Sequence, residues 1–117
     1  MWTVFLAPEF LKEVEAASED FRRELYSQAG ILERFGPAAK RPHVDTLKGS
    51  KYANMKELRF SAFGGVWRVA FAFDPERNAI LLVAGDKSGA GEGTFYKRLI
   101  ATADKRFAAH LWRLRNR

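Results

Sequence analysis

The spacing of hydrophobic residues in the first third of the chain predicts one strand followed by two helices. Residues 2–6 (WTVFL) are rich in β-forming side chains and end at Ala7-Pro8. Pro8 suits the first turn of a helix, and Ser18, followed by two acidic residues, suits the cap of a second helix. Gly36-Pro37 ends that second helix. Its stripe at helical spacing comprises Phe21, Leu25, Gln28, Leu32 and Phe35, and the polar Gln28 is the exception among apolar residues.

In the second half of the chain the hydrophobic period shortens to two residues, which predicts three strands before a last helix. Residues 56–61 and 66–73 alternate between large apolar residues and smaller or polar ones. Residues 79–84 are apolar throughout, as expected of a central strand covered on both faces. The last helix is predicted to start near Phe95, after a glycine-rich hinge at 88–94. Its apolar stripe comprises Leu99, Ile100, Ala103, Phe107 and Leu111.

The order of these elements predicts an α+β fold in a single domain, residues 1–117. The order is β-α-α-β-β-β-α, with a long connection at 37–55. We expect an antiparallel sheet with the helices packed on one face. The other face is expected to stay partly open and to carry Arg59 and Arg68, because both arginines alternate with bulky apolar neighbours.

Composition narrows the classes of function. The 117 residues include no cysteine, which excludes a disulfide framework, a thiolate zinc site and a cysteine nucleophile, and suits a reducing compartment. No run approaches the roughly 20 apolar residues of a membrane span. The apolar N-terminus has no basic segment before it, so it does not predict a signal peptide. We therefore expect a cytoplasmic protein with no membrane partner.

Positive charge is concentrated towards the C-terminus. The net charge of the chain is +6. Residues 1–30 carry a net charge of −3, whereas residues 87–117 contain eight basic and two acidic residues. A basic face attracts polyanions and speeds their encounter. This asymmetry favours a nucleic acid or a strongly acidic partner over charge that serves solubility alone.

Four residues are candidates for phosphodiester chemistry: Arg68, Arg59, Lys87 and Tyr96. Arg68 shares its strand face with two alanines, whose small side chains leave room for a guanidinium to bind a phosphate. An ordinary solvated strand position fits the same pattern. Arg59 lies two residues from Glu57, which fits either a surface ion pair or a site cation with its orienting carboxylate. Lys87 follows the last strand.

Further basic residues are candidates for RNA contacts. Lys48 and Lys51 lie in the long connection, where solvated loop charge is the alternative interpretation. Lys56 begins a predicted strand, and Lys97 and Arg98 follow the candidate tyrosine.

Metal and nucleotide sites are not indicated. His43 and His110 have no companions at metal-ligand spacing, so we expect neither a metal nor a cofactor. The glycine-rich segment after Gly85 lacks the Gly-Lys-Ser/Thr ending of a phosphate-binding loop. A Ser-His-Asp triad stays open at this point, because its members need not be adjacent in sequence.

The chain resembles a known superfamily, most clearly in segments of its second half. The segments LKGSKYANMKELRF, WRVAFAFDP, AILLVAGDK, FYKRLI and ADKRF follow one another in an order similar to that of RelE/ParE toxins of type II toxin–antitoxin systems. The resemblance is strongest to the HigB-like, phage-associated branch and covers nearly the whole chain. The chain departs from relatives in two places. Where they carry lysines on the strand, it offers Lys56 and Glu57 out of strict register, and its glycine-rich insertion before Tyr96 is longer.

The resemblance implies a role for each candidate residue in metal-independent RNA cleavage. Arg68 matches the strand arginine that holds the scissile phosphate, and Arg59 matches a basic position of the preceding strand. Lys87 falls at the basic position after the last strand, and Tyr96 falls near the catalytic or base-stacking aromatic residue. The two arginines would stabilise negative charge, and Lys87 or Tyr96 would transfer protons.

The resemblance also implies partners. The expected activity is that of a ribosome-dependent mRNA endoribonuclease, with mRNA on the ribosome as substrate. A cognate helix-turn-helix antitoxin would neutralise it, and the complex would bind operator DNA through the antitoxin. Two alternatives stay open: a ParE-like inhibitor of DNA gyrase without nuclease activity, and a basic RNA-binding module.

Overall fold

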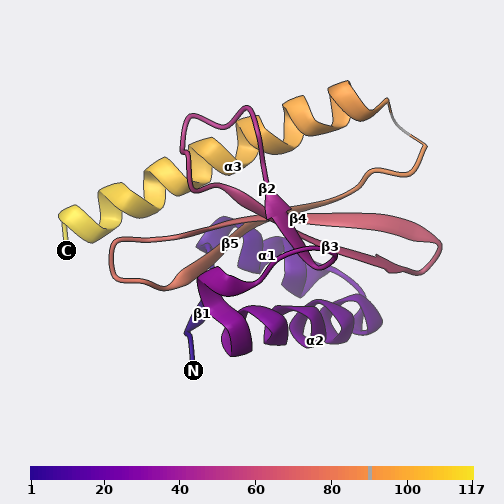
Figure 1. Cartoon of the computed structure of the whole chain (residues 1–117), viewed down its shortest axis with the longest axis horizontal. Helices are drawn as coiled ribbons and strands as arrows, with labels where there is room; N and C mark the ends of the chain where they lie inside the picture. Colours follow the sequence, from indigo (N-terminus) through magenta and orange to yellow (C-terminus); the bar gives the residue numbers. More distant parts are fainter. Residues whose placement is uncertain (90) are drawn as a thin grey trace.

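The computed structural model describes residues 1–89 and 91–117 and confirms the α+β class. A five-stranded sheet with the order β1-β5-β4-β3-β2 lies at its centre (Figure 1). The elements along the chain are β1 (Val4–Leu6), α1 (Pro8–Ala16), α2 (Glu19–Phe35), a 3-10 helix (Gly36–Ala38), β2 (Val44–Thr46), β3 (Lys56–Ala62), β4 (Gly65–Phe73), β5 (Ala79–Asp86) and α3 (Glu92–Arg115).

The predicted antiparallel meander of the last three strands is confirmed, but the sheet as a whole is mixed and not antiparallel throughout. The first strand, β1, runs parallel to β5 and pairs with it over Ala79–Leu81. The remaining neighbours are antiparallel. The parallel pair arises because the chain leaves β1 at Pro8, where α1 begins, and returns to the sheet only after both helices.

The long connection contains a short strand, β2, that the sequence pattern did not predict. It pairs antiparallel with the start of β3, with Val44 opposite Leu58 and Asp45 opposite Glu57. A strand of three residues is too short to show an alternating hydrophobic pattern, and Pro42 just before it is typical of a loop. The strand matters for function because it places Asp45 beside the candidate site.

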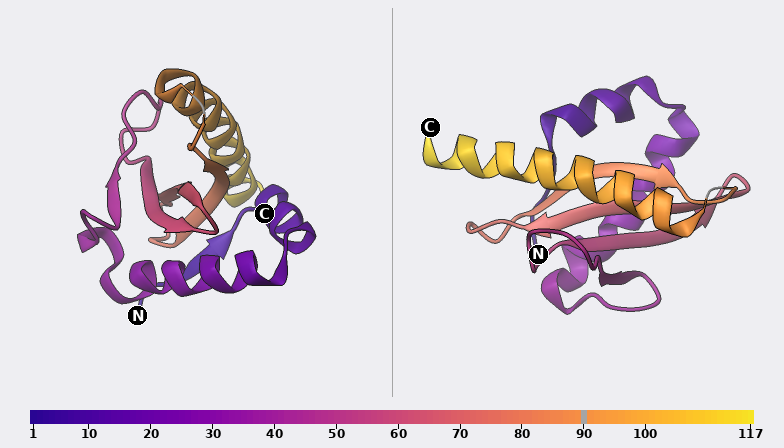
Figure 2. Two further views of the ribbon diagram at one scale, coloured as in Figure 1. Left: turned by 90° about the vertical axis from the view of Figure 1, so that its right-hand side faces the viewer. Right: turned by 90° about the horizontal axis from the view of Figure 1, so that it is seen from above.

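Helices cover both faces of the sheet, in contrast to the prediction of one open face. In Figure 2, α1 and α2 lie on one side of the strands and α3 crosses the other. Ala70 and Ala72 of β4, predicted to face solvent, are fully buried. The apolar stripe of α3 packs on this face, because small side chains in a strand leave room for a helix to approach. The buried members of that stripe are Leu99, Ala103 and Phe107.

The helix ends follow the predicted signals with two exceptions. The Ser18 side chain caps α2 by accepting a hydrogen bond from the Phe21 backbone N–H at 3.1 Å. Phe35 was predicted in the buried stripe of α2 but is 51% exposed, because it lies in the last turn, where the helix leaves the sheet. The last helix begins at Glu92, earlier than predicted, and residue 90 of the predicted hinge lies outside the described residues. No helix of the described residues is long and apolar enough to cross a membrane.

Gly36, directly after α2, packs against Trp2, which lies just before β1. Its φ of +54° lies in the left-handed region, and a Cβ there would clash with the Trp2 ring. We expect Gly36→Ala to lower the free energy of unfolding by about 2 kcal/mol or more, through backbone strain and overpacking.

Gly30 provides the matched control for that measurement. It lies inside α2, and a Cβ there would meet nothing closer than 3.9 Å. We expect Gly30→Ala to raise stability by about 0.5–1 kcal/mol. Urea unfolding of both variants tests the pair, and equal midpoints would contradict the assigned role of Gly36.

Candidate functional site

A cleft of about 480 Å³ lies where β2, β3 and the first turn of α3 meet. Three of the four predicted catalytic residues, Arg59, Lys87 and Tyr96, line it together with Lys48. Arg41, Asp45 and Glu57 line it as well. Residues from four separate segments of the sequence therefore meet at one concave surface that carries an excess of basic groups.

The floor of this region is a buried contact between the sheet and α3. The Tyr96 hydroxyl donates a hydrogen bond to Glu57 Oε1 at 2.7 Å and accepts one from Arg68 Nε at 3.2 Å. Arg68 Nε lies 3.6 Å from the same Glu57 oxygen, and both side chains are only 7% exposed. A second guanidinium nitrogen of Arg68 donates to the Trp67 carbonyl at 2.9 Å. Each charged group of the pair is thus compensated locally, as buried charges require.

The register of β3 and β4 produces this contact. Arg59 and Arg68 are directly opposite each other, and Glu57 is one diagonal step away from Arg68. The predicted shared face of the two arginines is therefore confirmed. However, α3 covers Arg68, which lies beneath Tyr96 and is not presented to solvent. The prediction that Arg68 points from an open face is wrong, because that face is occupied by the helix.

Burial and the Glu57 carboxylate both raise the pKa of the Tyr96 hydroxyl above its usual value. The hydrogen bond from Arg68 acts in the opposite direction but is the smaller effect. Tyr96 therefore keeps its proton at neutral pH.

Arg59 has a different carboxylate partner from the one expected. Its Nη1 lies 3.5 Å from Asp45 Oδ2, whereas Glu57 is engaged by Arg68 and Tyr96. Arg41 binds the same Asp45 oxygen at 2.7 Å through Nη2 and 3.0 Å through Nε. The Arg41 hydrogen bonds, followed by one from the Thr46 backbone, hold the pKa of Asp45 below its usual range.

The sequence analysis did not identify Arg41 or Asp45 as site residues. The signal that could have found them is the Arg-x-x-x-Asp spacing at 41–45, which brings both side chains to the same end of β2. That spacing predicts a contact between the two side chains only if the strand is already known. In a loop, residues that are four positions apart need not lie beside each other. Their discovery therefore depends on the short strand that periodicity missed.

Lys87 lines the cleft beside Tyr96. Its backbone N–H continues the ladder by donating to the Val66 carbonyl at 2.8 Å. Its Nζ lies 5.8 Å from the centre of the Tyr96 ring and 3.2 Å from Glu92 Oε1. Glu92 is largely exposed and holds the amine only loosely, so the Lys87 charge stays beside the tyrosine.

The structure separates the remaining predicted RNA contacts from this cleft. Lys56 lines an adjacent hollow with Arg41 and Thr46, and Lys51 and Lys97 are exposed. Arg98 borders a different cavity, beside Phe95 and Val83. A role in RNA binding for these four residues stays a prediction.

The loop that carries Lys48 and Lys51 is fastened to α3. Ser50 Oγ donates to Asp104 Oδ1 at 2.5 Å, and the Lys51 backbone N–H donates to Asp104 Oδ2 at 3.1 Å. Asp104 is only 8% exposed. This contact bridges more than fifty residues of sequence and fixes one wall of the cleft relative to the helix that supplies Tyr96.

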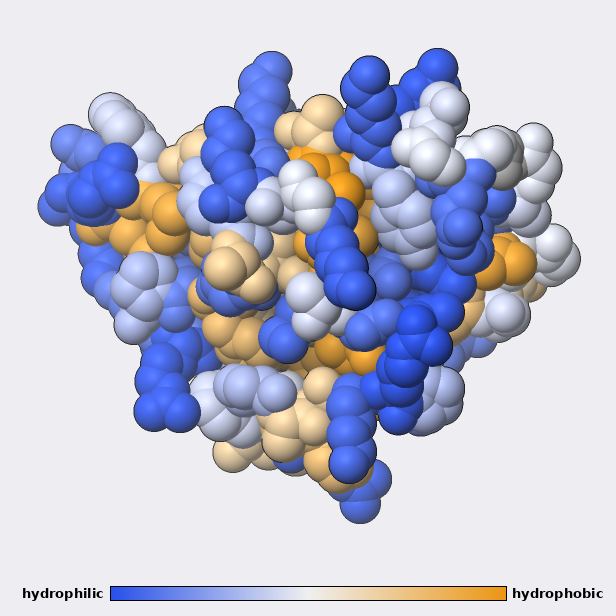
Figure 3. Space-filling model, turned by 45° about the horizontal axis from the view of Figure 1, so that its top comes forward, coloured by the Kyte–Doolittle hydropathy of each residue, from blue (hydrophilic) through white to orange (hydrophobic). Residues whose placement is uncertain are grey.

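Hydrophilic side chains predominate on the face that α3 and this loop share, with apolar residues visible between them (Figure 3).

Within residues 1–89 and 91–117, no group of three or more His, Asp or Glu side chains is arranged to hold a metal ion. His110 pairs with the buried Asp74 at 2.8 Å, which fastens the C-terminal half of α3 to the turn after β4.

The chain belongs to the family of phage-derived Gp49-like proteins (DUF891), whose profile matches residues 12–108. It is similar to two proteins of Mycobacterium tuberculosis (strain ATCC 25618 / H37Rv). It is 46% identical over 88 residues to "Putative toxin HigB2", which covers 74% of this chain and 43% of that protein. It is 40% identical over 103 residues to "Putative toxin HigB3", which covers 88% of both chains. The predicted HigB-like relationship is confirmed, although the chain spans less than half the length of the first relative.

The buried pair predicts a large effect of a conservative substitution. Glu57→Gln would leave the Arg68 guanidinium buried without a counter-charge, so we expect a loss of about 3 kcal/mol in the free energy of unfolding. Asp45→Asn removes a more exposed carboxylate and serves as the control, with a far smaller expected change. Urea titrations compare the two, and similar losses would refute a special role for Glu57.

The raised pKa of Tyr96 predicts a stability difference at high pH. The contribution of Tyr96 is fully present below its unfolded-state pKa of about 10. It is lost as the pH rises from there through the higher folded-state pKa, because the unfolded chain ionises first. Wild type should therefore lose more stability than Tyr96→Phe above about pH 10. The free energy of unfolding of both proteins, measured from neutral to alkaline pH, checks this, and parallel curves would argue against it.

Proposed function

We propose that the chain is the toxin of a type II toxin–antitoxin system and acts as a ribosome-dependent endoribonuclease that cleaves mRNA and so stops translation. The names of the two relatives support the toxin assignment. The observation that favours nuclease chemistry is the cleft itself. A protonated, doubly hydrogen-bonded Tyr96 hydroxyl lies among the cations of Arg59, Arg41 and Lys87.

The proposed reaction is transesterification within the RNA. The 2′-hydroxyl oxygen attacks the adjacent phosphorus, the bond from phosphorus to the 5′-oxygen breaks, and a cyclic phosphate and a 5′-hydroxyl result. The proton of the 2′-hydroxyl leaves to water, and Tyr96 donates its proton to the departing 5′-oxygen. Arg68 already donates to the tyrosine oxygen, so it stabilises the phenolate that forms. Before the reaction Glu57 accepts the hydrogen bond from this hydroxyl, so the O–H must turn from Glu57 to the 5′-oxygen when the RNA binds.

The exposed cations act on the phosphate. Arg59 and Lys87 line the cleft and stabilise the additional negative charge of the transition state. No histidine is among the described residues that line the cleft, and its carboxylates, Asp45, Glu57 and Glu92, are each paired with a basic side chain, so we assign no protein base to the 2′-proton. Such a site is weak unless the RNA is held in line, which accounts for a requirement for the ribosome as the positioning surface.

The partners follow from the same proposal. A helix-turn-helix antitoxin neutralises the toxin, and the complex binds its operator DNA through the antitoxin. The basic surface, with a net charge of +6, favours both the RNA substrate and an acidic antitoxin segment.

Regulated expression with mapping of RNA 5′-ends tests this proposal. We expect growth arrest with new ends in translated mRNA. Arg59→Ala and Lys87→Ala should each reduce the rate of cleavage on purified ribosomes by about 10²–10³-fold. Tyr96→Phe should reduce it by about 10²–10⁴-fold, because it removes the proton donor. Lys12→Ala, on the exposed side of α1, serves as the control and should cut at the wild-type rate.

The outcomes separate the alternative functions. Growth arrest accompanied by DNA damage, with mRNA left intact, would show that the protein inhibits gyrase and is not a nuclease. Cleavage of naked RNA at the same rate as ribosome-bound mRNA would remove the ribosome requirement. Unchanged cleavage by Tyr96→Phe would overturn the proposed acid.

A further inference from the structure

The turn between β3 and β4 holds an aromatic residue in a conformation that suits smaller residues. The ladder closes with Ala62 opposite Gly65, so Phe63 and Gly64 alone form the turn. Their φ values are +54° and +72°, and positive values at both central residues are typical of a type I′ hairpin turn. Glycine and asparagine adopt this left-handed conformation readily, whereas a bulky side chain is strained in it.

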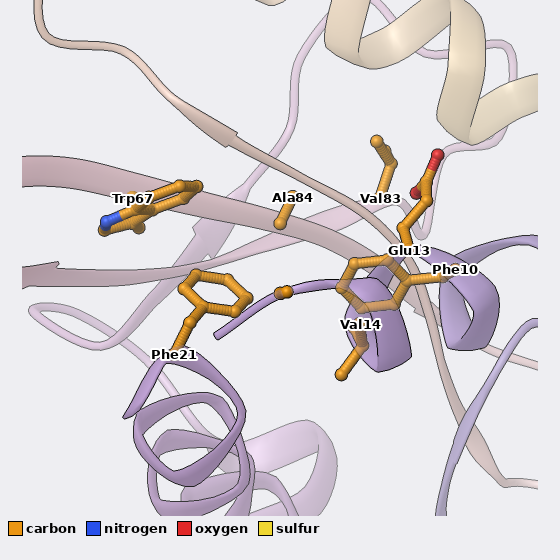
Figure 4. Close-up of a pocket in the computed structure, with 8 residues that line it drawn as sticks. Phe10, Glu13, Val14, Phe21, Trp67, Val83 and Ala84 are labelled. Carbon is orange, nitrogen blue, oxygen red and sulfur yellow. The ribbon is translucent and has the colours of Figure 1, made fainter. Parts of the chain in front are cut away.

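Packing does not account for the phenylalanine. Phe63 is 63% exposed, the largest exposed fraction among the aromatic residues that the structure describes. By contrast, the adjacent aromatic pair of the ladder packs inwards: Phe60 is buried, and Trp67 contacts Phe21 with the ring centres 4.8 Å apart (Figure 4). A Cβ on Gly64 would meet nothing within 4 Å, so the tip stands in open space. Strain of this kind concentrates where a protein holds a ligand, which indicates a role for Phe63 outside the fold.

The turn is held beside the cleft. Asp86 Oδ1 accepts hydrogen bonds from the backbone N–H groups of Val66 and Ser88, both at 2.9 Å. Lys87, between these two acceptor and donor positions, bonds to the Val66 carbonyl and lines the cleft. Val66 is only two residues from the turn, and in Figure 1 the turn lies at the end of the sheet where α3 begins. The tip of the hairpin is therefore fixed close to Lys87.

Strand geometry sets the distance from the turn to the proposed reaction centre. Arg59, which lines the cleft, is four residues before Phe63 in the sequence. At about 3.3 Å per residue, the two positions are roughly 13 Å apart. At this separation Phe63 would meet a nucleotide that flanks the scissile phosphate, and not the two nucleotides that this phosphate joins.

The surroundings of Phe63 favour a nucleobase over a protein surface as its partner. Its neighbours Ser61 and Gly64 are exposed and offer no apolar surface, whereas Lys87 supplies positive charge nearby. A side chain that anchors a protein partner draws its affinity from surrounding contacts that exclude water, and these neighbours do not provide them. Stacking on a base requires only an exposed π-face, together with cations that hold the phosphates.

We propose that Phe63 stacks on an unpaired base of the RNA held in the cleft. That this RNA is the mRNA substrate rests on the proposed function. The hairpin turn keeps the ring at a fixed separation from Lys87 and Arg59, so the stacked base positions the RNA chain relative to the cations that act on the phosphate. Because every base offers a π-face, the contact tolerates any sequence.

The test uses the purified chain and a hexanucleotide RNA that carries a 2′-O-methyl group on every sugar. This RNA lacks the attacking hydroxyl, so binding is measured without cleavage. We expect the NMR signals of the Phe63 ring to move upfield in a saturable manner, because a stacked base shields them. An abasic nucleotide is then placed at each position in turn. At one position it should weaken binding to wild type but not to Phe63→Asn.

Substitutions at Phe63 separate binding from folding. Phe63→Asn should raise the midpoint of urea unfolding, since asparagine suits the left-handed conformation, and yet weaken RNA binding about fivefold or more. Phe63→Tyr keeps the ring and should bind as wild type does. Phe35→Ala is the control, because Phe35 is 51% exposed but belongs to α2, on the other face of the sheet (Figure 2). It should keep wild-type affinity.

The proposal is overturned if Phe63→Asn binds the RNA as tightly as wild type, if the Phe63 ring signals do not move at saturation, or if no RNA binds up to about 1 mM. A lower urea midpoint for Phe63→Asn would contradict the strain assigned to the turn. Cleavage is measured separately, on ribosomes. A chain that cuts mRNA but binds RNA without Phe63 refutes the aromatic contact alone. A chain that binds RNA through Phe63 but never cuts mRNA refutes the nuclease alone.

Discussion

The buried contact between Glu57, Arg68 and Tyr96 is the constraint on which the rest of the molecule depends. Two charges that are 7% exposed are tolerable only if each keeps its partner, and a tyrosine from α3 completes the set. This contact joins β3, β4 and α3 at a single point. It therefore fixes the helix that covers the second face of the sheet, and the same helix supplies the proton donor of the proposed reaction.

The basic residues of the site fall into two groups, one buried within the fold and one accessible to a ligand in the cleft. Arg68 is buried and contacts the Tyr96 hydroxyl, whereas Arg59 and Lys87 line the open cleft. Their carboxylate partners are not equivalent either, because Glu57 is buried and Asp45 is shared between two arginines at the surface. An incoming phosphate can displace a surface carboxylate at little cost, but it cannot displace Glu57 without exposing a buried guanidinium.

Periodicity predicted the elements whose signal is long and local. The alternation of 66–73 and the helical stripe around Leu99 and Phe107 located β4 and α3, and Ser18 marked the start of α2. The predictions that failed concern features that depend on contacts between residues distant in sequence. The three residues of β2 acquire meaning only beside β3, and Arg68 becomes buried only when α3 lies over it. Strand alternation identifies two faces, but it does not say which of them a remote helix covers.

A double-mutant cycle between Glu57→Gln and Tyr96→Phe tests most directly whether one contact serves both fold and chemistry. The free energy of unfolding and the rate of mRNA cleavage on ribosomes are measured for wild type, both single variants and the double variant. We predict coupling of about 0.5–3 kcal/mol in stability and a double variant that cuts no more slowly than Tyr96→Phe alone. Additive effects in both measurements would contradict the account, because Glu57 and Tyr96 would then act independently.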